Sequence, residues 1–190
     1  MKRYFTSDWH LGSELILEKC HRPFKNIQQM DKLIIHNATC RLKKDQNDIL
    51  YHVGDFMCYK NDRGFKGTVL KQSDYLKQID RNIIFIRGNH DDSNRVKCHM
   101  DSMITNIGPY SNVSVSHYPS MYKETECLNL PRHHIHLCGH VHGDKKWLYF
   151  YDKHMDILNI NVGIDLWNYQ IVPESRIVEL IQKIIPTLNR

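Results

Sequence analysis

The chain has 190 residues, a mass of 22.6 kDa and a formal net charge of +5 with histidine counted as neutral. Its 41% hydrophobic and 25% charged residues are ordinary for a globular protein, and nine glycines and six prolines exclude a collagen-like or low-complexity chain. No apolar run approaches the roughly 18 residues of a membrane span, and Asp8 interrupts the N-terminus before a signal peptide could form. We therefore expect one cytoplasmic domain over residues 1–190.

Charge, cysteine and histidine content narrow the functional classes. The 26 Lys and Arg residues exceed the 21 Asp and Glu residues, which favours anionic partners weakly and falls short of the dense basic stripe of a nucleic-acid-binding protein. The six cysteines include no C-x-x-C pair, so we expect free thiols and no cysteine among the metal ligands. The 13 histidines are more informative, because histidine is the commonest metal ligand and an acid–base group near neutral pH.

The first half of the chain alternates short apolar runs with segments of helical periodicity. Apolar runs at residues 3–6, 48–53 and 82–86 predict strands, and apolar residues spaced three and four apart predict helices over residues 27–42 and 68–79. Because these strands are continuously apolar and separated by helices, we expect a buried, largely parallel sheet.

The second half has a different pattern. Residues 112–116 alternate apolar and polar side chains, and further strands are predicted over residues 135–138, 147–151 and 157–162. Pro173 is placed to open a final helix with an isoleucine-rich face. Together these elements predict an α/β domain in which two sheets pack face to face with helices outside.

Polar clusters follow five of the predicted strands. They are Asp8-x-His10, Gly54-Asp55, Gly88-Asn89-His90-Asp91, His117 and Gly139-His140-x-His142. Ligands gather at the carboxyl edge of strands in α/β folds, and Asp, Asn and His donors suit divalent ions such as Mn²⁺, Fe²⁺, Zn²⁺ or Co²⁺. On extended backbone both members of each D-x-H or H-x-H pair would point to one side and chelate together. The glycines would let the backbone approach closely and turn sharply.

Each cluster taken alone has an ordinary explanation. Gly54-Asp55 fits a turn, Gly88-Asn89-His90-Asp91 fits a helix cap, and His117 fits a half-buried histidine. Their occurrence in order, each after a strand, favours a metal centre. Three other sets of residues each have two interpretations. Trp9 could form a pocket wall or simply pack in the core, and Asp91 could orient His90 or cap the following helix. His133, His134 and His136 could bind a third metal ion, but we favour solvated or core histidines.

The order of these clusters resembles the calcineurin-like metallophosphoesterase superfamily from Asp8 to His142. The flanking segments HRPF at residues 21–24 and NVGIDLWNYQIVP at residues 161–173 are similar to a short bacterial and phage branch of it. The resemblance implies a four-layer αββα sandwich, with two mixed β-sheets face to face and helices outside, and a centre of two divalent metal ions.

The resemblance also implies a role for each matched position. Seven residues would hold the ions, three at a first site, three at a second and one bridging them: Asp8, His10 and His142; Asn89, His117 and His140; and Asp55. His90 would be the general acid, and Asn89 would also contact substrate. Arg22 resembles a phosphate-binding arginine of the short branch, the alternative being a loop salt bridge.

The implied activity is hydrolysis of a phosphodiester or phosphomonoester by a hydroxide that bridges the two ions, with His90 protonating the leaving group. We expect Mn²⁺, with Fe²⁺, Zn²⁺, Ni²⁺ or Co²⁺ as alternatives, and a small, nucleotide-like substrate without membrane attachment. A nuclease or an RNA- or DNA-end processing phosphatase is the second hypothesis. A non-catalytic scaffold with the same fold is the third.

Overall fold

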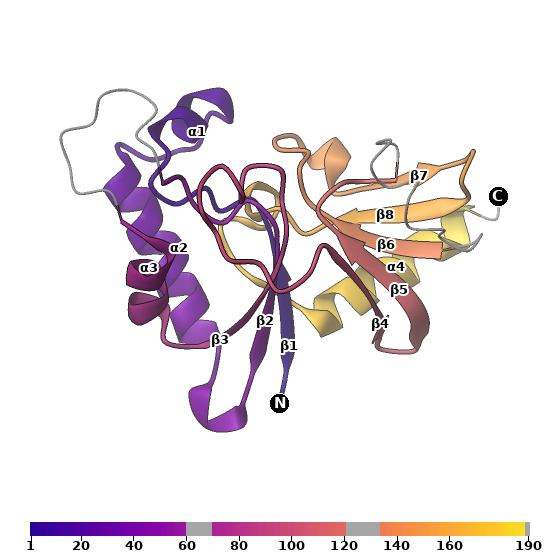
Figure 1. The fold of residues 1–190 in the computed structure, drawn as a ribbon. Helices are drawn as coiled ribbons and strands as arrows, with labels where there is room; N and C mark the ends of the chain where they lie inside the picture. The colour runs from indigo at the N-terminus through magenta and orange to yellow at the C-terminus, as the bar shows by residue number, and fades with distance from the viewer. Residues whose placement is uncertain (60–69, 121–133, 189–190) are drawn as a thin grey trace.

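The computed structural model describes residues 1–59, 70–120 and 134–188, and its strands form two mixed sheets (Figure 1). The first sheet has the strand order β3-β2-β1-β9, and the second has the order β4-β5-β6-β8-β7. The strands are β1 (Arg3–Thr6), β2 (Ile49–Val53), β3 (Asn82–Ile86), β4 (Ser102–Ile107), β5 (Tyr110–Ser116), β6 (His134–Cys138), β7 (Tyr149–Asp152), β8 (Ile157–Asn161) and β9 (Val172–Pro173). The α-helices are α1 (Glu14–Lys19), α2 (Ile27–Arg41), α3 (Gln72–Ile79) and α4 (Glu174–Leu188).

The first sheet is largely parallel, as its continuously apolar strands predict. β1 pairs in parallel with β2 and β2 with β3, while the short β9 adds to β1 in the antiparallel direction. α2 and α3 cover one face of this sheet (Figure 1). Their buried side chains, among them Met30, Ile34 and Ile79, pack with Leu50 and Phe85 from the strands in one hydrophobic core. That burial fixes the strands whose ends carry the polar clusters.

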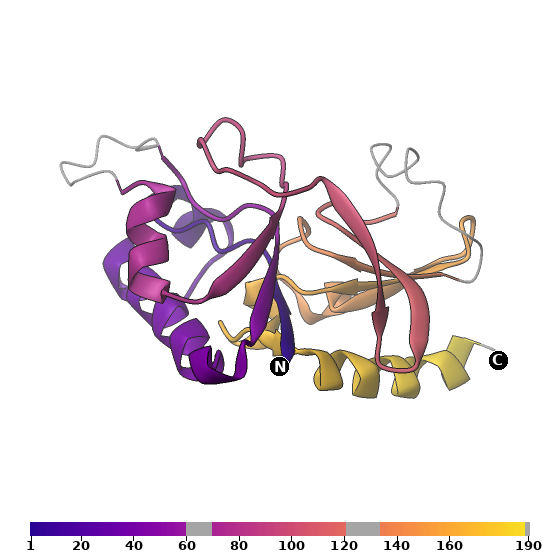
Figure 2. The same ribbon diagram turned by 60° about the horizontal axis from the view of Figure 1, so that its bottom comes forward.

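A second core lies between the two sheets. Phe5, Val53 and Ile86 of the first sheet pack there with Val115 and Leu137 of the second. α4 adds a row of buried isoleucines to the same core, at positions Ile177, Ile181 and Ile184. Figure 2 shows α4 running along the lower side of the second sheet. The expected α/β class with two mixed sheets is confirmed.

Most predicted elements are present with ends shifted by a few residues. α3 begins at Gln72, and residues 68 and 69 of the predicted helix lie outside the described residues. β7 begins at Tyr149, and α4 begins at Glu174 because Pro173 pairs with Tyr4 in β9.

Among the described α-helices and strands, the sequence analysis missed α1, β4 and β9. α1 and β9 are too short to show a period, and β4 is largely accessible to solvent and so lacks a buried apolar run. None of the described helices is long and apolar enough to cross a bilayer.

The loops that follow the strands are tied together by the backbone. His10 N donates a hydrogen bond to Asp55 O at 3.0 Å, which joins the loop after β1 to the loop after β2. Gly139 N donates to His117 O at 2.9 Å, which joins the loop after β6 to the loop after β5. Ser7 N donates to Val162 O at 3.1 Å, which joins the end of β1 in the first sheet to the end of β8 in the second and brings the predicted clusters to one shared edge.

Candidate metal centre

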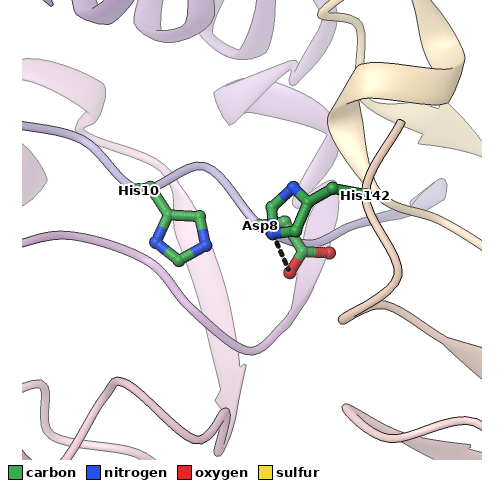
Figure 3. Close-up of side chains that lie close together, drawn as sticks. All are labelled: Asp8, His10 and His142. Carbon is green, nitrogen blue, oxygen red and sulfur yellow. Dashed lines mark ion pairs between the residues drawn. The ribbon is translucent and has the colours of Figure 1, made fainter. Parts of the chain in front are cut away.

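Asp8, His10 and His142 form the first group of potential ligands (Figure 3). One ligand atom from each lies within 4.8 Å of the others. His142 Nε2 is 3.6 Å from Asp8 Oδ1. The Asp8 carboxylate is buried and also accepts hydrogen bonds from Ser7 Oγ at 2.5 Å and from the His140 backbone N–H, so its orientation is fixed.

Asp55 lies between this group and a second one. Its Oδ2 atom is 3.5 Å from His10 Nε2 and 3.4 Å from His117 Nε2. Its Oδ1 atom accepts the backbone N–H of His90 at 2.9 Å. One carboxylate oxygen therefore lies near an imidazole of each group, and Asp55 is the residue for which the family resemblance implies a bridging role.

Asn89, His117 and His140 converge on the far side of Asp55. Asn89 Oδ1 is 2.9 Å from His117 Nε2 and 3.0 Å from His140 Nδ1. His117 Nδ1 donates to Val53 O at 2.9 Å, which orients the ring so that Nε2 points toward Asp55 and Asn89. All seven predicted ligands thus lie in one continuous cluster.

The backbone at the site is not extended as the spacing argument assumed. Asp8, His10, Asp55 and His140 have φ values of 61°, 48°, 59° and 69°, in the left-handed region that non-glycine residues seldom occupy. The D-x-H and H-x-H pairs therefore converge through left-handed residues in the loops rather than by strand alternation, and that prediction was wrong. Each such conformation costs about 1–3 kcal/mol and is retained mainly at functional sites.

Glycine is required at positions 54, 88 and 139 of these loops, as the sequence predicted. A Cβ atom on Gly88 would lie 2.3 Å from Asp55 Oδ1, and one on Gly139 would lie 2.6 Å from Asp8 Oδ2. Both contacts are far inside van der Waals distance, so any larger residue would displace the Asp55 or Asp8 carboxylate.

The electrostatics of the site show where positive charge is favoured. Burial alone would lower the pKa of His117, but its hydrogen bond to Asp55 and the nearby carboxylates raise it to about 9. Burial likewise opposes protonation of His142, yet the charge of Asp8 and the hydrogen bond to Asp165 raise its pKa to about 11. Despite burial, His117 holds the pKa of Asp55 below its usual range. In the metal-free protein, protons therefore balance the buried carboxylates.

His10 provides the test of whether these residues fit metal ions. Its Nε2 atom is buried, has no hydrogen-bond partner among the described residues and points toward Asp55. Burial lowers the pKa of His10 well below its usual range, so the ring is neutral and one of its two nitrogens carries a lone pair that can bind a cation. A neutral imidazole beside buried carboxylates is a suitable donor set for a divalent cation. The residues fit the two ions that the family resemblance implies.

His90 lies outside the ligand cluster but next to it. Its ring centroid is 5.5 Å from that of His10, and the residue is exposed. It lines a pocket of about 420 Å³ together with His10, Asp55 and residues of α1. This placement gives His90 access both to a bound molecule and to solvent, as a proton donor requires.

Asp91 holds the loop that carries Asp55, a role that neither sequence interpretation of this residue included. Its Oδ2 accepts the backbone N–H groups of Asp55 at 3.0 Å and Gly88 at 2.7 Å, and its Oδ1 accepts that of Phe56 at 3.0 Å. Burial raises the pKa of Asp91, and these three bonds oppose the rise. Its position within the GNHD motif was the available signal, but two of its three partners, Asp55 and Phe56, come from a different strand end.

Arg22 forms the salt bridge that was the alternative to phosphate binding. Its side chain is fully buried, and its guanidinium pairs with Asp165 through Nε at 2.8 Å. The guanidinium faces protein acceptors and does not line the 420 Å³ pocket, so this geometry does not support the expected contact with substrate.

The remaining candidates belong mainly to the cores. Trp9 is fully buried against Phe56, which supports the packing reading. His134 and His136 are buried and hydrogen-bonded to β5 and its following loop, as expected of core histidines, whereas His133 lies outside the described residues. Cys20 lies with His142 and Asp165, with one ligand atom of each within 4.8 Å of the others, so the absence of cysteine ligands stays a prediction.

Comparison with known proteins gives consistent relationships. The calcineurin-like phosphoesterase family model matches residues 1–161. The uncharacterized protein MJ1445 of Methanocaldococcus jannaschii is 30% identical over 192 residues, covering 99% of this chain and 97% of that protein. The crystal structure of a protein of unknown function, AQ665 from Aquifex aeolicus, matches with a TM-score of 0.66 and 24% identity, covering 95% of this chain and 99% of that one. This last similarity concerns the fold alone.

Proposed function

The chain belongs to the calcineurin-like phosphoesterase family, and we propose that it is a hydrolase of small phosphate esters that uses two divalent metal ions. The observation that carries the proposal is the position of Asp55, whose Oδ2 atom lies 3.5 Å from His10 and 3.4 Å from His117. A carboxylate shared by two ligand groups can hold two cations together while its charge screens their repulsion. The oxygen and imidazole donors favour Mn²⁺ as the ion to test first.

Each part of the cluster has a defined task in this proposal. One ion would be held by Asp8, His10 and His142 and the other by Asn89, His117 and His140, with Asp55 common to both. When bound, such ions neutralise phosphoryl charge and activate water as a nucleophile. His90 would donate a proton to the departing oxygen, which contributes typically about 10²–10⁴-fold to the rate. Its backbone N–H is fixed on Asp55, which places the acid close to the ligands.

The pocket over the cluster supports a small substrate. A volume of about 420 Å³ accommodates a ligand of roughly nucleotide size. One wall comes from α1, where Leu15 and Ile16 offer apolar contact and Lys19 offers a positive charge. We therefore propose a phosphate ester with an apolar or aromatic leaving group, a description that a nucleotide satisfies.

The proposal is tested by assaying Mn²⁺-loaded protein against p-nitrophenyl phosphate, bis(p-nitrophenyl) phosphate, nucleotides, cyclic nucleotides and oligonucleotides. We expect turnover that a chelator abolishes and Mn²⁺ restores. His10→Ala should lose this activity, whereas His36→Ala, which changes an exposed histidine of α2, should retain it. A protein that binds two ions yet hydrolyses none of these esters would support the scaffold hypothesis. Preference for oligonucleotides, with steep loss of turnover as salt increases, would support the nuclease hypothesis.

A further inference from the structure

Asp165 contacts the metal-site histidine His142 from the side opposite to the other ligands. Its Oδ2 atom is 2.8 Å from His142 Nδ1, while His142 Nε2 faces Asp8 at 3.6 Å. The Asp165 side chain is only 8% exposed. A carboxylate that accepts the Nδ1 proton fixes the tautomer and the plane of the imidazole, and it increases the basicity of Nε2.

Arg22 holds Asp165 in that position. Its Nε and Nη2 atoms donate to the two carboxylate oxygens at 2.8 and 3.0 Å, although the two residues are 143 positions apart in the chain. A planar guanidinium and a carboxylate joined by two parallel bonds have a defined relative orientation. The orientation of Asp165, and through it that of His142, is therefore set by Arg22.

The same guanidinium also fixes the loop that carries Asp8. Nη2 donates to Asp8 O at 2.7 Å and Nη1 donates to Trp9 O at 2.9 Å, while Nη1 also points to Met30 Sδ at 3.3 Å. The five contacts of Arg22 account for all five N–H groups of a guanidinium. No N–H group of Arg22 is left for a phosphate group. The positions of both Asp8 and, through Asp165, His142 depend on this one side chain.

We propose that Arg22 and Asp165 are positioning residues for the metal site formed by Asp8, His10 and His142. Asp165 presents His142 Nε2 to the ion, and Arg22 locks Asp165 and the Asp8 backbone into one rigid unit. This inference rests on the proposed function, because it requires that an ion binds at this group. It assigns the pair no contact with substrate.

The test is a Mn²⁺ titration of metal-free protein, with free Mn²⁺ measured by electron paramagnetic resonance. In Asp165→Asn, one of the two dissociation constants should increase by about 10–100-fold, the usual effect of losing an outer partner of a histidine ligand, and the other should change by less than about threefold. Arg22→Lys, which keeps the charge but loses the two-pronged geometry, should weaken the same site.

The matched control is Glu174→Gln. Glu174 forms an equally close two-pronged pair with Arg3, at 2.7 and 2.6 Å, between α4 and β1 and outside the ligand cluster. This variant should lower the melting temperature and leave both dissociation constants unchanged. The control separates the loss of a structural salt bridge from the loss of ligand positioning.

A double-mutant cycle tests whether Asp165 acts through His142. In a His142→Ala background, Asp165→Asn should weaken binding by less than about threefold further, because its effect passes through the missing ring. If the effects of His142→Ala and Asp165→Asn on the dissociation constant multiply, the proposal is overturned. Unchanged dissociation constants in both Asp165→Asn and Arg22→Lys would also overturn it. If either Asp165→Asn or Arg22→Lys fails to fold, the dissociation constants of the other variant test the proposal by the same criterion. A wild-type protein that binds none of Mn²⁺, Fe²⁺, Zn²⁺, Ni²⁺ and Co²⁺ would instead refute the proposed function, and this inference with it.

Discussion

Asp91→Asn is the substitution that most directly probes how the loop around Asp55 is held. The carboxylate accepts three backbone N–H groups, two at Oδ2 and one at Oδ1, and it is buried. Asparagine has one oxygen in place of two. If that oxygen takes the Oδ2 position, the bonds to Asp55 and Gly88 survive, but the amide NH₂ then faces the N–H of Phe56 across about the 3.0 Å now spanned by a hydrogen bond.

The magnitude follows from these three bonds. The Phe56 N–H, left buried without an acceptor, costs about 1–3 kcal/mol, and the two remaining bonds each lose about 1 kcal/mol when the charged acceptor becomes neutral. The lower desolvation cost of a neutral amide offsets part of this sum. We expect a net loss of about 2–4 kcal/mol in the free energy of unfolding, which for a chain of this size lowers the melting temperature by roughly 5–15 °C.

The assay is thermal and urea unfolding of the metal-free protein, with Asp92→Asn as the control. Asp92 is the neighbouring acid, but its side chain is 70% exposed and its partner Arg87 lies at the surface. Its loss should cost less than about 0.5 kcal/mol. Equal, small effects of the two substitutions would show that Asp91 does not hold the Asp55 loop.

Four further predictions address the ions, the acid and the core. Asp55→Asn should lower the Mn²⁺ content from about two ions per chain and remove most activity; two tightly bound ions with near-normal turnover would exclude a bridging role. His90→Asn should keep the metal and slow esters with alkoxide-like leaving groups by roughly 10²–10⁴-fold, with much less effect on p-nitrophenyl esters; equal losses on both would contradict the general-acid role. Because the pKa values of His117 and His142 are about 9 and 11 without metal, Mn²⁺ binding at pH 7.5 should release about two protons and should tighten as pH rises. Calorimetry in buffers of different ionisation enthalpy measures the number of protons released. An Mn²⁺ affinity that is independent of pH between 6 and 8 would refute this prediction. His52 is buried with both ring nitrogens lacking partners among the described residues, and burial lowers its pKa to about 3, so stability should fall as pH decreases from about 6.5 toward 3. His52→Phe should lessen that fall by up to about 1.4 kcal/mol per pH unit, and parallel pH profiles of the two metal-free proteins would disprove the cause.

That the candidate ligands would lie near one another could be predicted from the sequence because each follows a strand end, whereas their individual roles came from the family resemblance. Parallel strands bring their carboxyl ends to one edge, so Asp8, Asp55 and Asn89 had to be near one another once the strands were recognised. His117 and His140 followed by the same argument applied to the second sheet. Periodicity was sufficient to place these residues at shared strand ends, and the order of the motifs and the resemblance supplied the rest.

The supporting contacts could not be predicted in the same way. The left-handed backbone at Asp8 and His140 depends on tertiary hydrogen bonds, and a two-residue spacing alone favoured an extended chain. Asp91 bonds to a loop 35 and 36 residues earlier, and Arg22 bonds to Asp165 143 residues later. Side-chain partners at such separations leave no periodic pattern in one sequence, so only the fold identifies them.

We propose that one cluster of this chain binds two divalent ions around Asp55. The most direct measurement is anomalous diffraction at the manganese edge from crystals of the protein grown with Mn²⁺. We predict two peaks, one among Asp8, His10 and His142 and one among Asn89, His117 and His140, with the Asp55 carboxylate contacting both. A single peak, or peaks away from Asp55, would contradict the account.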